Sequence, residues 1–126
     1  IGDRYWDPLW EAAVELDLPV SFHIGSGNME AGLTQQKMQA YGRMAAFTEI
    51  SVALFMRNGV QLADLLMSGV LARFPTIKFV SVESGIGWIP YFLERADFTN
   101  ERHGLWTNVD FAGEKPSDVF NRHFYT

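Results

Sequence analysis

The chain has 126 residues, a net charge of −5 and a hydrophobic content of 48%. This length allows one domain or part of one, since domains commonly contain about 100–200 residues, and the apolar content excludes a wholly disordered chain. The absence of Cys excludes disulfides and thiolate metal sites, and the basic residues form no cluster that could follow a nucleic-acid backbone.

No segment has the pattern of a membrane span or of a secretory signal. The apolar run Ile50–Met56 is far shorter than the roughly 20 residues of a membrane-spanning helix, and no basic segment opens the chain. We therefore expect a soluble, cytoplasmic protein with no membrane or nucleic-acid partner. The first residue is Ile1 rather than Met, so we expect the chain to be part of a longer protein.

The first predicted helix covers residues 8–17. Asp7-Pro8 supplies an N-cap residue and a proline at the first helical position, and apolar residues then recur with a period near 3.6. A short β-rich run, Val20–Ile24, follows and ends at the turn-forming residues 25–28. This pattern places His23 at the carboxyl end of a strand.

Two helices are predicted in the middle of the chain. Residues 29–39 are mixed and polar and indicate a loop, whereas apolar residues with helical spacing run from Tyr41 to about Arg57. Asn58-Gly59 predicts a break. A second helix is expected over 60–74, because Pro75 disfavours the α conformation of the residue before it.

The second predicted strand, Ile77–Val82, leads into a tight turn at 83–87 and a helix over 88–102. A polar loop then precedes a short helix with Ser117 as its N-cap, and Phe124 opens a third strand. This alternation of strands and helices predicts an α/β fold with a parallel sheet. The first two strands should be parallel neighbours.

His23 and Glu83 are the main candidate site residues because each follows a predicted strand, where α/β folds collect ligand-binding groups. Two interpretations of His23 remain open, a histidine bonded to a nearby backbone group and a metal-binding or catalytic one. The equivalent placement of Glu83 favours a site, since the two side chains would project from the same edge.

Several other residues have both a functional and a structural interpretation. The turns Gly25-Ser26-Gly27 and Gly85-Ile86-Gly87 could bind a phosphate or carboxylate through backbone N–H groups, but they lack the spacing and the Lys of nucleotide-binding motifs and also suit tight turns. Trp88 is either core or the wall of a pocket. His103 and His123 have the positions of ordinary exposed or capping histidines.

Three segments carry a resemblance to a known family: Leu18–His23, Ser68–Phe79, and Gly85 with Pro90, Arg95 and Asp97. They resemble the second half of an amidohydrolase-related protein, in the branch that contains aminocarboxymuconate-semialdehyde decarboxylase and benzoate-type decarboxylases. The resemblance implies a (β/α)8 TIM-type barrel. Because such a barrel needs about 250 residues, residues 1–126 would form one partial domain with about strands five to seven.

The resemblance also implies roles for single residues. His23, at the end of strand five, would be a ligand of a catalytic divalent metal ion, which we expect to be zinc. The family has a His-x-Gly pattern at strand six, where this chain has Glu83-Ser84-Gly85. We expect Glu83 to act as a general acid/base or a further ligand, and Trp88, Gly25 and Ser26 to contact substrate. The family's His-x-His of strand one and Asp of strand eight have no counterpart.

The resulting prediction is part of a metal-dependent enzyme that hydrolyses or decarboxylates a small carboxylate- or amide-bearing substrate. A non-catalytic α/β scaffold without a complete metal site is the alternative, since a fold does not by itself imply a function. Half a barrel would expose unpaired strand edges and apolar helix faces. We therefore also expect association into a homo-oligomer.

Overall fold

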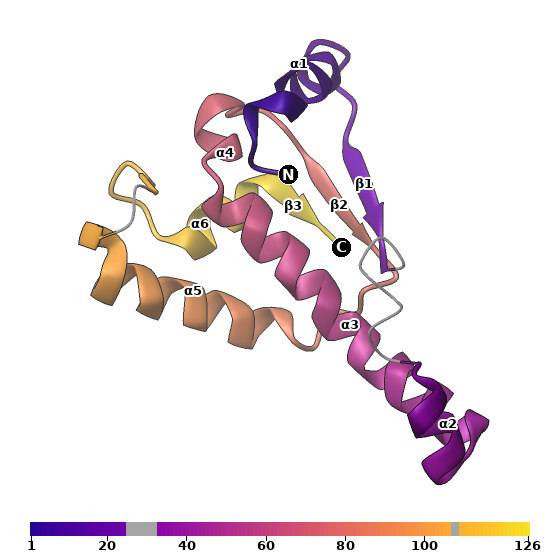
Figure 1. Ribbon diagram of the computed structural model, residues 1–126. Coiled ribbons are helices and arrows are strands. Elements are labelled where there is room, and N and C mark those ends of the chain that lie inside the picture. Colours follow the sequence, from indigo (N-terminus) through magenta and orange to yellow (C-terminus); the bar gives the residue numbers. More distant parts are fainter. Residues whose placement is uncertain (25–32, 107–108) are drawn as a thin grey trace.

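The computed structural model describes residues 1–24, 33–106 and 109–126. Within them, three strands form a parallel sheet in the order β1 (Val20–His23), β2 (Phe79–Val82) and β3 (Phe124–Tyr125), as Figure 1 shows. β1 and β2 are direct neighbours, with His23 in register with Val82. The predicted α/β class and the parallel pairing of the first two strands are confirmed.

Helical segments precede β1 and connect the strands. In chain order they are η1 (Arg4–Trp6), α1 (Asp7–Glu15), α2 (Gln35–Tyr41), α3 (Arg43–Met67), α4 (Val70–Arg73), α5 (Ile89–His103), η3 (Gly104–Trp106) and α6 (Pro116–His123). The predicted helices near both ends and after β2 are therefore present. The middle of the chain differs from the prediction.

The core lies between the helices and one face of the sheet. Phe79 of β2 is fully buried, packs edge-on against Trp10 at 5.6 Å between ring centroids and stacks on Phe124 at 5.4 Å. Alternate residues of a strand point to opposite faces. Phe79 and Ser81 therefore face the helices, whereas His23, which is exposed like every second residue of β1, points away from them.

α2 forms in a segment that was predicted as a loop. Thr34 caps it, because the Thr34 hydroxyl accepts a hydrogen bond from the Lys37 N–H at 3.2 Å. The helix ends at Gly42, whose φ of +89° is readily adopted only by glycine. The loop prediction was wrong for residues 35–39 because it used polar composition and neglected this cap.

α3 continues through Asn58-Gly59, where a break was predicted. Both residues are buried, and a Cβ on Gly59 would lie 3.2 Å from the Trp88 ring. The glycine therefore permits a close approach of helix and indole, and this packing outweighs a helix-propensity cost of about 1 kcal/mol. The separate helix predicted over 60–74 is the end of α3 followed by α4.

The N-terminal half of α3 and α2 project together beyond the sheet (Figure 1). By length and composition alone, α3 is long and apolar enough to cross a membrane, and 28% of its most apolar stretch is buried within the chain. The expected absence of a membrane partner stays a prediction.

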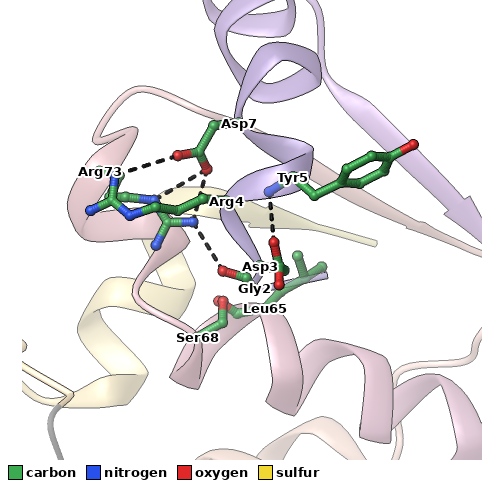
Figure 2. Close-up of polar contacts among 8 residues, drawn as sticks. All are labelled: Gly2, Asp3, Arg4, Tyr5, Asp7, Leu65, Ser68 and Arg73. Carbon is green, nitrogen blue, oxygen red and sulfur yellow. Dashed lines mark hydrogen bonds and ion pairs between the residues drawn. The ribbon is translucent and has the colours of Figure 1, made fainter.

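Asp7 does not cap α1, contrary to the prediction. Trp6 occupies the N-cap position, and the Asp7 carboxylate instead accepts hydrogen bonds from the Arg73 guanidinium of α4 at 3.0 and 3.3 Å. Arg73 also donates to the Gly2 carbonyl at 3.2 Å (Figure 2). A Cβ on Gly2 would lie 2.4 Å from the Ser68 Cβ, so only glycine fits where the N-terminal segment meets the end of α3.

Ser117 is not the N-cap of α6 either, since Lys115 occupies that position. The Ser117 hydroxyl donates to Asp97 of α5 at 2.7 Å, and the Ser117 N–H donates to the other carboxylate oxygen at 2.9 Å. The start of α6 is therefore capped by a side chain from another helix, which local sequence cannot reveal.

Candidate functional site

His23 and Glu83 meet at the carboxyl edge of the parallel sheet. His23 is the last residue of β1, and Glu83 follows the last residue of β2. His23 Nε2 lies 3.0 Å from Glu83 Oε2, and the two side chains are 56% and 70% exposed. The structure therefore brings the two main candidates together at one edge, as the sequence predicted.

The backbone of Glu83 has an unusual conformation that the sequence did not reveal. Its φ is +60°, in the left-handed region, which costs a residue with a side chain roughly 1–2 kcal/mol. The next turn residue with positive φ is Gly85, at +65°. Such strain persists only where surrounding structure imposes it, and it occurs preferentially at functional sites.

Buried polar contacts beneath the turn impose this conformation. The Ser84 and Ser81 hydroxyls form a buried hydrogen bond of 2.5 Å. The Trp88 indole N–H donates to the Ser84 carbonyl at 2.9 Å. Neither serine was predicted as part of the site, although the strand alternation that buries Phe79 also places Ser81 on the buried face. Their contacts hold the turn from which Glu83 reaches His23.

Trp88 is partly buried and packs within the helix layer. Its ring meets Phe92 at 5.7 Å between centroids and lies against Gly59 of α3. In this position Trp88 supports the 83–87 turn. Its contact with substrate stays a prediction. Gly25 and Ser26, the other predicted substrate contacts, lie outside the described residues.

The other histidines are not part of this edge. His123 is buried at the end of α6 and bonds through Nδ1 to the Ile77 carbonyl at 2.8 Å. His103, at the end of α5, lies against the Trp106 ring at 5.6 Å. A cavity of about 380 Å³ is lined by His123 and Pro75, on the side where β2 and β3 begin, and is therefore remote from His23.

The donors at the edge fit part of a metal site. Imidazole nitrogen and carboxylate oxygen are both zinc ligands, and two ligands about 2.0–2.1 Å from a tetrahedral zinc lie roughly 3.3 Å apart. The observed 3.0 Å between His23 and Glu83 is close to that separation. Catalytic zinc sites typically use three protein ligands, and residues 1–24, 33–106 and 109–126 contain no group of three potential ligands.

Two exposed ion pairs with shifted pKa values lie away from this edge. The Lys37 ammonium contacts Glu49 at 2.5 Å, and its hydrogen bond, with that of the Tyr41 hydroxyl, lowers the pKa of the Glu49 carboxyl. Lys78 donates to Asp17 at 2.7 Å and lowers the pKa of that carboxyl. The first pair was not predicted, because residues 29–39 were expected to form a loop.

The chain is similar in sequence to known proteins. The sequence model of the amidohydrolase family matches residues 1–122. The 2-keto-4-carboxy-3-hexenedioate hydratase of Sphingobium sp. (strain NBRC 103272 / SYK-6) is 33% identical over 91 residues, which are 72% of this chain and 22% of that protein.

A solved structure supports the fold. The crystal structure of an amidohydrolase from Mycobacterium avium subsp. paratuberculosis K-10 matches 98% of this chain and 30% of its own with a TM-score of 0.67 and 23% identity. The chain thus spans less than a third of the length of either of these two proteins.

Proposed function

The chain belongs to the amidohydrolase family, and on that premise we propose that it carries part of the active site of a metal-dependent enzyme. The proposed reactions are hydrolysis or decarboxylation of a small substrate with a carboxylate or amide group. The observation that supports the proposal is the 3.0 Å contact between His23 and Glu83 at the carboxyl edge of a parallel sheet. In (β/α)8 barrels this edge is where catalytic residues gather.

We assign separate roles to the two residues. His23 provides an imidazole nitrogen for the metal ion, which we propose to be zinc and which would polarise the substrate or activate water. Glu83 would hold or release a proton of the substrate or of water at Oε2, because an imidazole nitrogen that binds the metal ion cannot at the same time share a proton with the carboxylate. The bonds from Ser81 and Trp88 to Ser84 keep the Glu83 carboxylate in place without contacting the reacting groups.

The remaining metal ligands are proposed to come from other strands of the barrel. The described residues would correspond to about strands five to seven, and the two relatives are several times longer than the match. The name of the curated relative describes a hydratase acting on a carboxylate-rich compound. That name supports a small carboxylate as the substrate class. It also agrees with hydrolysis as the reaction, because hydration and hydrolysis both add water to the substrate.

Metal content and turnover in the native full-length protein test the proposal. We expect His23→Ala to lose the metal, as measured by elemental analysis. We expect Glu83→Gln to keep most of the metal and lose about 10²–10⁴-fold in rate, the usual contribution of a proton-transfer group. His103→Ala and Glu101→Gln are the matched controls outside the site.

Turnover would be followed by hydration of 2-keto-4-carboxy-3-hexenedioate and by release of carbon dioxide from benzoates. Unchanged metal content in His23→Ala would remove His23 from the site and overturn the proposal. Full activity in both variants would show that the reaction does not depend on His23 or Glu83, whereas the absence of both turnover and bound metal in the native protein would favour the alternative, a non-catalytic scaffold.

A further inference from the structure

α3 contacts the turn that carries Glu83 at two points, one helical turn apart. Gly59 is buried, and a Cβ there would lie 3.2 Å from Cζ3 and 3.4 Å from Cε3 of the Trp88 indole. Phe55 precedes Gly59 by four residues and therefore lies on the same side of the helix. Its ring is 3.5 Å from the position of a Cβ on Gly85. The helix thus supports the turn directly.

The Trp88 indole has neighbours on three sides. Its six-membered ring lies over Gly59, its N–H donates to the Ser84 carbonyl at 2.9 Å, and Phe92 packs edge-on at 5.7 Å between ring centroids. Because the indole is rigid and planar, a push on the six-membered ring also moves the N–H relative to Ser84. Gly59 therefore affects a hydrogen bond that it does not itself make.

Ser84 follows Glu83 directly, so the position of Ser84 affects where the Glu83 carboxylate lies. The Ser84 carbonyl bonds to Trp88 and its hydroxyl to Ser81, and these two bonds hold the turn in which Glu83 has a φ of +60°. From this turn the carboxylate reaches His23 at 3.0 Å. A misplacement of about 1 Å can cost an enzyme about 10²-fold in rate, so even a small displacement of the indole would slow proton transfer.

The helix itself does not require a glycine at position 59. α3 continues on both sides of Gly59, and glycine destabilises the interior of a helix relative to alanine. Its backbone has no positive φ, unlike that of Gly42 at +89°. The three atoms nearest to a Cβ at position 59 all belong to the Trp88 ring. The need for glycine therefore comes from the position of the indole.

We propose that Gly59 is a positioning residue for the reaction. By leaving room for the Trp88 indole, it keeps the bond to the Ser84 carbonyl and thereby the Glu83 carboxylate in place. The inference rests on the proposed proton-transfer role of Glu83. Gly59 acts through Trp88 and Ser84 and not through contact with substrate, and each of these contacts lies within the part of the chain that the structure describes.

Gly59→Ala in the native full-length protein tests the proposal. The added methyl group requires the indole to move by a few tenths of an ångström, whereas the helix gains propensity. We therefore expect kcat to fall about tenfold or more with little change in KM. The metal content should be unchanged and the urea midpoint should not be lower. Val60→Ala changes an exposed position of the same helix and is the matched control, which should keep the native rate.

Two NMR signals of the same protein report the displacement independently of turnover. Gly59→Ala should shift the indole N–H resonance of Trp88, because the bond of that N–H is disturbed. It should also shift the Cε1–H resonance of His23, because the Glu83 carboxylate lies 3.0 Å from the imidazole. Val60→Ala should shift neither resonance.

Further variants test the route of the effect. Trp88→Phe lacks the N–H that bonds to Ser84, so it should by itself shift the His23 resonance and lower kcat. Gly59→Ala should then lower the rate little further in the Trp88→Phe background. It should also have no further effect in Glu83→Gln, which already lacks the proton-transfer group. Independent losses, in which the two factors multiply, would overturn the proposal.

Two other results would also overturn it. An unchanged His23 resonance with native kcat in Gly59→Ala would show that the contact does not position Glu83. A lower urea midpoint together with loss of metal would make Gly59 a residue of the fold alone. If Glu83→Gln keeps the native rate, the proton-transfer role itself fails, and the His23 resonance then decides by itself whether Gly59 positions the Glu83 carboxylate.

Discussion

Replacing Glu83 by glycine should abolish the site without unfolding the protein. Glycine relieves the left-handed strain at φ +60°, about 1–2 kcal/mol, but loses about 0.5–1 kcal/mol to its greater freedom in the unfolded chain. The lost contact with His23 joins two largely exposed groups and contributes only about 0.2–1 kcal/mol. The net change in unfolding free energy for Glu83→Gly should therefore be close to zero.

Two further variants separate the effect of the backbone strain from the effect of the contact with His23. Glu83→Ala keeps the strain and loses the contact, so it should be about 0.5–1 kcal/mol less stable than Glu83→Gly. Ala112→Gly relieves a similar strain, at φ +53°, outside the site, and should be more stable than the native protein. Urea unfolding of the full-length protein measures all three. A loss of several kcal/mol in Glu83→Gly would refute the reasoning, because it would make Glu83 a structural residue.

The remaining predictions concern the core, the N-terminal segment, α2 and the metal. Phe79→Ala should lose about 3–5 kcal/mol of stability in urea, whereas the exposed Tyr91→Ala should change it by less than about 0.5 kcal/mol. Arg73→Ala should speed amide exchange in residues 2–7, which exposed Arg95→Ala should not. Lys37 lowers the pKa of Glu49, so their ion pair stabilises α2 fully at pH values above the ordinary carboxyl pKa. This stabilisation is lost as the pH falls through the lowered pKa of Glu49. The acid dependence of amide exchange in α2 should therefore disappear in Lys37→Met. Residues 1–126 alone should bind zinc weakly in calorimetry, since tight binding there would require ligands beyond His23 and Glu83.

The sequence predicted those parts of the fold that local patterns determine. β1 and β2 lie between turn-forming residues and alternate with helices, so their parallel pairing followed, and with it the meeting of His23 and Glu83. The bounds of the helices in the middle of the chain could not be predicted from local patterns. Asn58-Gly59 is a local breaking signal, but it is overruled by packing against Trp88, a residue remote in sequence.

The candidate site was predictable in its members and not in its conformation. Topology placed Glu83 at the right edge, whereas its positive φ depends on the bond between Ser81 and Ser84 and on the indole of Trp88. These contacts span only residues 81–88, but they require Ser81 to lie on the buried face of β2, which depends on the packing of the sheet against the helices. The same dependence explains the missed caps, since Asp7 and Ser117 find their partners on other helices.

The passage of α3 through Asn58-Gly59 also affects the chemical ageing of the protein. Asn-Gly pairs in flexible peptides deamidate readily, because the glycine amide nitrogen can attack the neighbouring side-chain carbonyl. In α3 the helical backbone keeps these groups apart, and Asn58 is 1% exposed, so hydrolysis there requires local opening of the helix. Aspartate that accumulates at residue 58 during storage would therefore record how often the middle of α3 has opened.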